Sequence, residues 1–306
     1  MRLSWNTPRW RKTESQELAN AETWLRERER YCVAASARFL ELKENPHLSR
    51  CRVWRLLNEE KSRPSALLIQ NRSSLFPVFG FGSCIPHNNT PVNIPGPRFL
   101  SRFLGKVNIH SVHGLKEDAE LLESLMEEQG YFAAERIEYH LMSLDIDPFF
   151  HPSDKIPETA LRQIPGLVLR KPEPKDEEQL FKLQAVYEQE EVLAKKSVFN
   201  PAACRLGLSK LLQKQEVLVS QLDGQVVGKI NTSAASFTRL QIGGVFVRPD
   251  YRGLGIGAAM SLTFTQKLLE KGKGLTLFVK KRNIAAQKIY KKAGFSVIAD
   301  YRISYY

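Results

Sequence analysis

The feature that most constrains this chain is a glycine-rich turn that joins an apolar segment to an amphipathic segment. The stretch GGVFVRPDYRGLGIG occupies residues 243–257. The residues at 245–247 are β-branched or aromatic, which favours a strand. Pro249 ends that strand because proline has no amide for a ladder. From Ile256 to Gly272, apolar residues recur at helical spacing. The sequence therefore predicts a strand–turn–helix unit.

The turn brings three glycines, Gly253, Gly255 and Gly257, to the start of the predicted helix. The first amides of a helix have no internal acceptor, and the helix dipole there favours negative charge. Glycine lets a phosphate approach the backbone without a Cβ in the way. The sequence therefore predicts an anion-binding turn, and the alternative is a tight turn in which the glycines serve packing alone.

Two common phosphate loops do not fit this turn. A nucleoside-triphosphate loop needs Lys and Ser or Thr after its last glycine, whereas Gly257 is followed by two alanines. A dinucleotide fingerprint needs G-x-G-x-x-G and an acidic residue after the next strand. Here the spacing is G-x-G-x-G, and the strand predicted at 275–279 leads into the basic residues 280–282.

The pattern R-x-x-G-x-G does fit, at Arg252, Gly255 and Gly257. It resembles the pyrophosphate loop of the GNAT N-acetyltransferase superfamily, whose members bind acetyl-coenzyme A. The following stretch, LTLFVKKRNIAAQKIYKKAGF, is similar to the family as well: a strand, Asn283, a helix with Tyr290 seven residues later, and Gly-Phe.

The preceding stretch, VLVSQLDGQVVGKINTSA at 217–234, predicts a hairpin with Asp223-Gly224 at its turn, as in the family's meander. The resemblance covers roughly residues 165–306. It implies an α+β fold, with a mixed, mostly antiparallel sheet flanked by helices.

Residues 1–150 are expected to form a second, smaller α+β domain, separated from the first by the proline-rich stretch 146–166. Helices are predicted near 14–45 and 116–129, with strands between them. This layout resembles a degraded GNAT copy without R-x-x-G-x-G, as in some bacterial members with an extra N-terminal domain. The alternative is an unrelated α+β module for recognition.

The resemblance implies roles for individual residues. Tyr290 takes the place of the family's general acid, and a strand amide near Val247 that of the oxyanion donor. The residues expected to hold the cofactor lie on the strand, in the turn and before the last helix: Val245, Phe246, Val247, Arg252, Gly253, Leu254, Gly255, Ile256, Gly257, Ala258 and Asn283. A buried core tyrosine and a helix N-cap are the purely structural alternatives for Tyr290 and Asn283.

The general base is less well determined. The strand position at which some relatives carry a glutamate is Phe278, and no histidine follows His151. Glu191, with its neighbour Glu190, is the best remaining candidate, acting through a water if necessary. Surface carboxylates without a catalytic role are the alternative.

Charge is unevenly distributed. The net charge is +12, and residues 161–306 hold 24 basic and 12 acidic residues against 21 of each in residues 1–160. A basic half attracts polyanions, coenzyme A and nucleic acid among them. No apolar run approaches 18 residues, so no membrane span is expected. The four cysteines lack metal-ligand spacing, so we expect no metal, reduced thiols and a cytoplasmic protein.

These observations and the resemblance predict an acetyl-CoA-dependent N-acetyltransferase that moves acetyl directly to a primary amine of a small molecule or peptide in a ternary complex. Two other functions stay open: an inactive acyl-CoA-binding or sensing module, and a nucleic-acid-binding protein suggested by charge alone. The sequence does not predict the oligomeric state.

Overall fold

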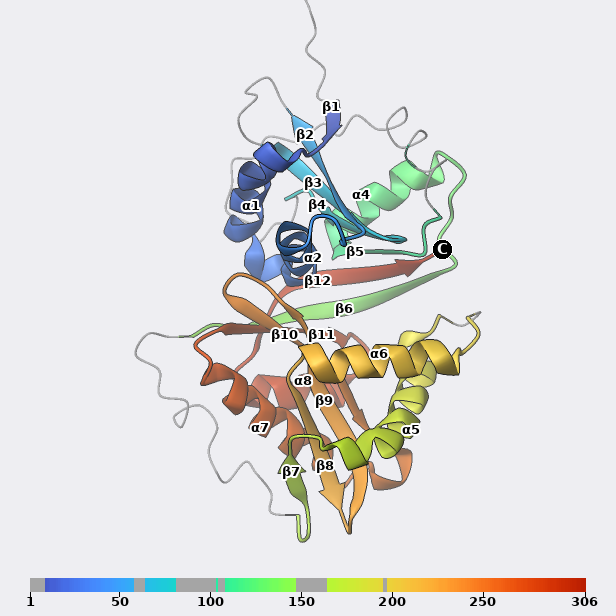
Figure 1. Ribbon diagram of the computed structural model, residues 1–306, viewed down its shortest axis with the longest axis vertical. Coiled ribbons are helices and arrows are strands. Elements are labelled where there is room, and N and C mark those ends of the chain that lie inside the picture. Colours follow the sequence, from blue (N-terminus) through green and yellow to red (C-terminus); the bar gives the residue numbers. More distant parts are fainter. Residues whose placement is uncertain (1–8, 58–63, 81–102, 104–107, 147–163, 195–196) are drawn as a thin grey trace, which may run out of the picture. The chain divides into compact units, whose positions relative to one another are not determined.

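The chain folds into two compact units, seen in the computed structural model of Figure 1, which describes residues 9–57, 64–80, 103, 108–146, 164–194 and 197–306. Unit 1 comprises Met1–Leu141 and Ile298–Tyr306, and unit 2 comprises Met142–Val297. These bounds differ from the expected ranges 1–150 and 165–306, because most of the last strand joins unit 1. The expected proline-rich break lies mostly outside the described residues.

The same order of elements occurs twice along the chain. In each half, a short strand and two helices precede a three-stranded meander, and the half ends with a strand, a helix and a last strand. In the second half α7 also follows the meander, where most of the corresponding residues of the first half lie outside the described ranges. The elements of the first half are β1 (Arg9–Lys12), α1 (Leu18–Glu27), α2 (Val33–Glu44), β2 (Cys51–Leu57), β3 (Pro64–Asn71), β4 (Ser74–Val78), β5 (Ser111–Leu115), α4 (Lys116–Glu127) and β6 (Glu135–Leu144). Those of the second half are β7 (Val168–Arg170), α5 (Glu177–Tyr187), α6 (Pro201–Lys214), β8 (Val217–Leu222), β9 (Gln225–Ala235), β10 (Arg239–Val247), α7 (Ile256–Leu269), β11 (Gly274–Lys280), α8 (Ile284–Lys292) and β12 (Ser296–Tyr305).

Strand pairing repeats as well. In unit 1 the order is β1-β2-β3-β4-β5-β12-β6, antiparallel from β1 to β4, with β4 and β5 parallel and β12 antiparallel to β5. In unit 2 the order is β11-β10-β9-β8-β7, antiparallel except for the parallel pair β10 and β11. Both units therefore have a mixed, mostly antiparallel sheet, which the resemblance implied for the C-terminal half.

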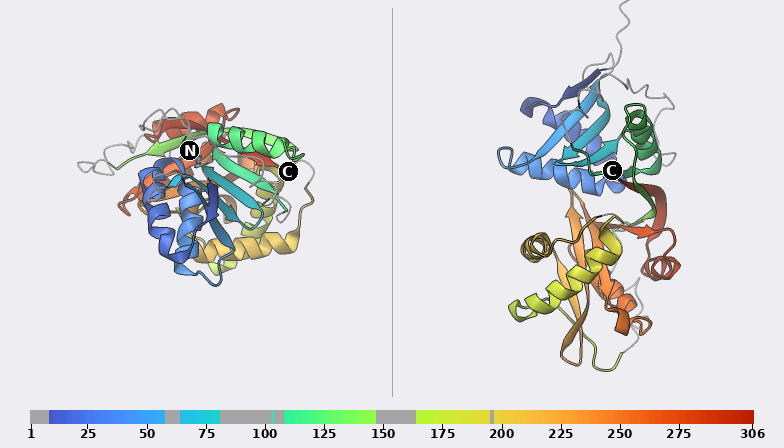
Figure 2. Two further views of the ribbon diagram at one scale, coloured as in Figure 1. Left: turned by 90° about the horizontal axis from the view of Figure 1, so that it is seen from above. Right: turned by 90° about the vertical axis from the view of Figure 1, so that its right-hand side faces the viewer.

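Helices cover both faces of the unit 2 sheet, because its strands carry apolar side chains on both faces. Helix α7 packs against β8, β9 and β10, and α5 packs against β9 and β10. In the right-hand view of Figure 2, the yellow α5 and α6 lie on one side of the orange strands and the red-orange α7 and α8 on the other. The larger apolar cluster lies on the α7 side and includes Met260, Phe264 and Leu277. The turn between β10 and α7 is thereby held at both ends, because β10 and α7 are both packed elements of this domain.

The predicted elements can be compared with the observed ones. The hairpin is confirmed: Asp223 and Gly224 both have positive φ, 49° and 78°, at the turn between β8 and β9. The helix expected at 116–129 is α4. The helical region expected at 14–45 is interrupted, because Arg28 and Cys32 leave helical geometry between α1 and α2.

Among the described residues, no helix is long and apolar enough to cross a membrane. Within the same residues, no group of three or more His, Cys, Asp or Glu could hold a metal ion. Cys32, Cys51 and Cys204 are buried free thiols, and Cys84 lies outside the described part of the chain.

Candidate active site

The site begins where β10 parts from β11. The parallel ladder runs from Arg239↔Gly274 to Ile242↔Leu277, and β10 continues for five further residues. On its other edge, β10 has a bulge: the register shifts between Gly243↔Asn231 and Phe246↔Lys229, so Gly244 and Val245 oppose the single residue Ile230. Gly244 has a φ of 59°, which a glycine adopts without strain. The bulge therefore lies just past the end of the β10–β11 ladder.

The turn after β10 presents backbone amides at the start of α7. Gly253 and Gly255 have φ of 83° and 88°, and Gly255 is the N-cap of α7. The amides of residues 253–257 donate to no carbonyl within the described residues, whereas the Ala258 amide donates to the Gly255 carbonyl at 3.1 Å. Five consecutive amides are thus available to an anion. Ala258, which was expected among them, is already engaged.

Gly257 differs from the other two turn glycines, because the fold does not require it. It lies within α7 without a positive φ, and a Cβ there would meet only the Val247 Cγ2 at 3.7 Å, an ordinary contact. Glycine inside a helix is destabilising by roughly 0.5–1 kcal/mol relative to alanine. A close approach by a ligand explains a glycine at this position better than the packing of the chain does.

Arg252 and Glu190 connect this turn to the segment that follows α5. The Arg252 Nε donates to the Val247 carbonyl at 3.1 Å, and its Nη2 pairs with the Glu190 Oε2 at 2.7 Å. Glu191, the expected base, pairs through its Oε2 with the Lys280 Nζ at 2.5 Å. Both glutamates lie in the π-helical turn Glu188–Val192, so this turn is tied to the ends of both β10 and β11.

The remaining residues expected to bind the cofactor differ in how far they are buried. Ile256 and Phe246 are buried, with 1% and 4% of their surface exposed, and Phe246 meets the Tyr187 ring edge-on at 5.8 Å. Leu254 is 50% exposed in the turn. Val245 and Val247 are half-buried and pack against the larger apolar cluster. Past the end of the β10–β11 ladder, then, one backbone edge of β10 is not paired with β11, whereas most of the Phe246 side chain is buried.

Tyr290 lies inside that same apolar cluster. Only 6% of it is exposed, and its ring meets Phe295 edge-on at 6.0 Å. Burial raises the pKa of Tyr290 to about 12, against a smaller opposite effect of its hydrogen bond with Ser261. Its hydroxyl is therefore protonated near neutral pH, as a proton donor must be. The structure brings Tyr290 and the strand residues Val245 and Val247 into one cluster.

The side chains of Asn283 and Glu191 both have hydrogen-bond partners within the fold. Asn283 is the N-cap of α8, and its Oδ1 accepts from the Ala286 amide at 3.1 Å. Its structural role is thus visible, and its side-chain nitrogen has no hydrogen-bond partner among the residues that the structure describes. Glu191 contacts Lys280, and within the described residues it makes no contact with Tyr290.

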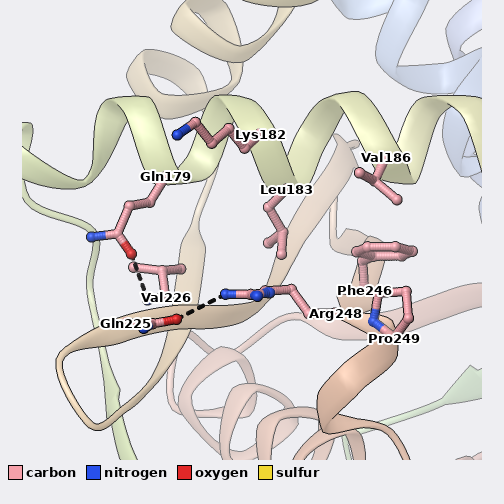
Figure 3. A pocket seen from close by; sticks show the side chains of 9 residues that line it. All are labelled: Gln179, Lys182, Leu183, Val186, Gln225, Val226, Phe246, Arg248 and Pro249. Atoms are coloured by element: carbon pink, nitrogen blue, oxygen red, sulfur yellow. Dashed lines mark hydrogen bonds between the residues drawn. The ribbon is translucent and has the colours of Figure 1, made fainter.

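A pocket of about 550 Å³ lies on the α5 side of the sheet. Figure 3 shows α5 forming one wall, with Phe246 and Pro249 at one end and Arg248 reaching between the walls. Gln179 accepts from the Val226 amide at 2.8 Å, and Arg248 donates to Gln225 at 3.0 Å. Because its charged lining residues are cationic, the pocket suits an anionic group better than an ammonium.

Lys229 and Asn231 are two polar residues of β9 in this region that were not predicted from the sequence. Lys229 has no exposed surface, and its Nζ donates to the Asn231 Oδ1 and to the Gly244 carbonyl, both at 3.1 Å. The same Nζ lies 4.5 Å from the centre of the Tyr187 ring. Burial lowers the pKa of Lys229 to about 7, although Glu188 and Cys204 raise it. The one available signal was a Lys-x-Asn pair on one face of an otherwise apolar strand.

Comparisons with known proteins bear on the family and the fold. Residues 180–295 match the model of the acetyltransferase (GNAT) family. Among solved structures, a Drosophila protein is 12% identical, with 98% of this chain and 99% of that chain covered and a TM-score of 0.62. A GCN5-related N-acetyltransferase from Sphaerobacter thermophilus is 17% identical, with 97% and 94% covered and a TM-score of 0.56.

A tandem GNAT protein from the clavulanic acid biosynthesis pathway is 11% identical, with 97% and 98% covered and a TM-score of 0.54. No curated protein matches the chain. At these identities the solved structures establish the fold, and the family model establishes the family of the segment that it matches. Residues 180–295 therefore form an acetyltransferase domain of the GNAT family, within a chain that has the fold of a tandem GNAT protein.

Proposed function

We propose that unit 2 transfers an acetyl group from acetyl-coenzyme A to a primary amine of a small molecule or peptide. The observation that carries this proposal is the combination of the open strand edge at the β10 bulge with the five unengaged amides of residues 253–257. Together they offer a site for a pyrophosphate and a backbone edge for an amide-bearing arm that leads away from it.

Acetyl-coenzyme A fits these groups chemically. Its pyrophosphate would bind the amides at the start of α7, where the helix dipole favours negative charge. The two amides of its pantetheine arm would pair with the backbone of residues 245–247, as an added strand does. Asn283 would donate to the arm through its side-chain nitrogen. The excess of positive charge in this half of the chain favours the same polyanionic ligand.

The transfer itself needs few groups. The nitrogen of the neutral amine attacks the thioester carbonyl, and an amide of β10 stabilises the resulting oxyanion. The C–S bond then breaks, and the leaving sulfur takes the proton of the Tyr290 hydroxyl, so coenzyme A leaves as a thiol and the tyrosinate regains a proton from water. Glu191 would accept the proton of the amine, directly or through water, once its ion pair with Lys280 opens.

An acyl-CoA-binding module without catalysis is the second candidate. It is favoured by the partners that the two proposed catalytic groups already have. Tyr290 is hydrogen-bonded to Ser261, and Glu191 is ion-paired with Lys280. In this function the domain would bind the thioester and report its presence to a partner.

Thiol release separates the two candidates. Acetyl-CoA is mixed with spermidine, with lysine and with a peptide that has a free N-terminus, and the release of coenzyme A thiol is followed with a chromogenic disulfide. We expect release that depends on one class of amine. Tight binding of acetyl-CoA in calorimetry without release on any amine would favour the binding module. Binding of nucleic acid that weakens steeply with salt would point to the charge-based alternative instead.

A further inference from the structure

We propose that Lys229 is a positioning residue for acetyl transfer: its ammonium polarises the peptide unit between Gly244 and Val245, whose N–H then stabilises the oxyanion. This inference rests on the proposed function and assigns a residue and a specific amide to it. Lys229 touches neither substrate, so it acts through the backbone of the bulge.

The position of Lys229 is the first argument. It pairs in register with Phe246, directly beside the bulge, and its Nζ lies 3.1 Å from the Gly244 carbonyl. The β10–β11 ladder ends two residues earlier, at Ile242. The ammonium is thus one hydrogen bond away from the backbone edge on which the acetyl group is proposed to lie.

The burial of Lys229 is the second argument, because stability does not explain it. A lone buried ammonium is strongly unfavourable unless it is paired. Within the described residues Lys229 has no ion-pair partner, and its contacts are two neutral oxygens and the Tyr187 ring. A methionine of similar length would fill the same space without a desolvation penalty. A buried charge that does not serve stability and faces a candidate site points to a role in the chemistry.

The third argument is the geometry of the peptide. The chain has no cis peptide among its described residues, so the carbonyl and the N–H of the unit between Gly244 and Val245 point in opposite directions. The carbonyl is directed at Lys229, and the Val245 N–H is therefore directed away from it. A charged donor on the carbonyl makes the opposite N–H a stronger donor, as in any chain of hydrogen bonds.

Neighbouring residues hold this arrangement in place. A Cβ on Gly244 would overlap with the Asn231 Oδ1, so only glycine fits there. The Asn231 nitrogen donates to the Gln215 Oε1 at 3.1 Å and to the Thr232 carbonyl at 2.9 Å. The Asn231 oxygen is therefore fixed toward Lys229, and the lysine cannot turn away from the Gly244 carbonyl without losing both contacts.

Ionisable groups around Lys229 make the effect dependent on pH. Glu188 faces it from the turn after α5, Cys204 from α6 and the Tyr187 ring from α5. Burial raises the pKa of the Cys204 thiol to about 11, so this thiol is neutral near pH 7. Burial lowers the pKa of Lys229 itself to about 7. The polarising charge is thus present in acid and is lost as the pH rises through neutrality.

The kinetic test compares Lys229→Met with Lys210→Met, which removes an exposed positive charge of α6. Acetyl-CoA turnover is measured from pH 5.5 to 9, and dividing the wild-type rate by the variant rate cancels the ionisation of the acceptor amine. For Lys229→Met we expect a ratio of about 10 below pH 6 that falls toward 1 above pH 8, smaller than the 10²–10³ lost with a whole oxyanion donor. The Lys210→Met ratio should stay near 1 throughout.

A structural role gives a different outcome. If Lys229 only supports packing, Lys229→Met lowers the melting temperature and its rate ratio does not change with pH. Our inference requires a rate ratio that changes with pH and an acetyl-CoA dissociation constant within about twofold of wild type. The melting temperature does not separate the two roles, because Lys229→Met leaves the Asn231 Oδ1 and the Gly244 carbonyl without their donor in either case. A ratio independent of pH overturns the inference even where the wild type is active.

A second measurement does not require turnover. The backbone amide of Val245 is followed by NMR in the free protein between pH 5.5 and 9. We expect its proton shift to move with a midpoint near 7 in the wild type and in Lys210→Met, and to stay constant in Lys229→Met. A Val245 shift that ignores Lys229 overturns the inference. Absence of thiol release from the wild type, with this titration intact, overturns the proposed acetyl transfer and not the polarised peptide.

Discussion

Replacement of Gly257 by alanine should raise the free energy of unfolding and lower the acetyl-CoA affinity at the same time. Gly257→Ala places a methyl group 3.7 Å from the Val247 Cγ2, which is an ordinary contact. Because alanine is favoured over glycine in a helix by about 0.5–1 kcal/mol, the free energy of unfolding should rise by that amount. For a unit of this size, the melting temperature should rise by roughly 2–4 °C per kcal/mol.

The effect on binding has the opposite sign. The same methyl group would stand beside the amide of residue 257, one of the five to which the pyrophosphate is proposed to bind. Gly257→Asp adds a negative charge at about 4 Å from the phosphates, where the repulsion is about 4 kcal/mol at an effective dielectric constant of 20. Screening at this exposed turn reduces the effect, so we expect an affinity loss of at least ~10²-fold, which is about 2.7 kcal/mol.

Gly207→Ala is the matched control for the stability arm. Gly207 lies in α6, also without a positive φ, and a Cβ there would meet no atom within 4 Å. Gly207→Ala should raise the free energy of unfolding as Gly257→Ala does, and it should leave the acetyl-CoA affinity unchanged. Calorimetry with acetyl-CoA and thermal unfolding on the three variants decide the matter. Wild-type affinity in a folded Gly257→Asp would refute the assignment of the turn as the pyrophosphate site. Gly255→Glu is a poorer probe, because a φ of 88° strains any side chain there.

Three further predictions use other parts of unit 2. Tyr290→Phe should lower turnover by roughly 10²-fold with an unchanged acetyl-CoA dissociation constant, because a general acid acts in the transition state; an unchanged rate would make Tyr290 a packing residue. Asn283→Ala should lower the free energy of unfolding by about 1 kcal/mol through the lost N-cap. Asn283→Asp should restore the stability but not the affinity if the nitrogen holds the cofactor arm. The hydrogen bonds from Arg170 hold the pKa of Asp176 below its ordinary value of 3.8, so the pair stabilises the fold above that pH and ceases to do so as the carboxylate protonates. Urea unfolding from pH 6 to 2.5 should therefore show a loss of stability below about pH 4 that is weaker in Asp176→Asn.

Much of unit 2 could be predicted because its signals are local. The turn at Asp223-Gly224 needs positive φ at both residues, and the start of α7 needs the glycines that precede it. Such requirements act within a few residues, so the sequence alone reveals them. The resemblance to the GNAT superfamily depended on motifs of the same local kind, and the family model matches the segment that contains most of them.

The parts that could not be predicted depend on contacts between distant residues. The ion pair between Glu191 and Lys280 joins positions 89 residues apart, and no spacing rule relates them. The interruption between α1 and α2 has no glycine or proline to mark it. The last strand was included in the C-terminal domain because the GNAT resemblance covers roughly residues 165–306. It pairs with β5 of unit 1, which only the folded topology reveals.

Three residues of unit 2 that depart from the regular pattern of a helix or strand lie near one another. Gly257 weakens α7 where alanine would fit, Gly244 lies in a bulge of β10, and Lys229 carries a buried charge without an ion-pair partner among the described residues. Each is a departure from the local preferences that stabilise a fold, and such departures are expected at functional sites. The three lie along one path, from the start of α7 through the bulge of β10 to β9. A chain built for stability alone would have an alanine in α7 and an apolar side chain on β9, so the occurrence of all three along this path supports the proposal that a ligand binds there.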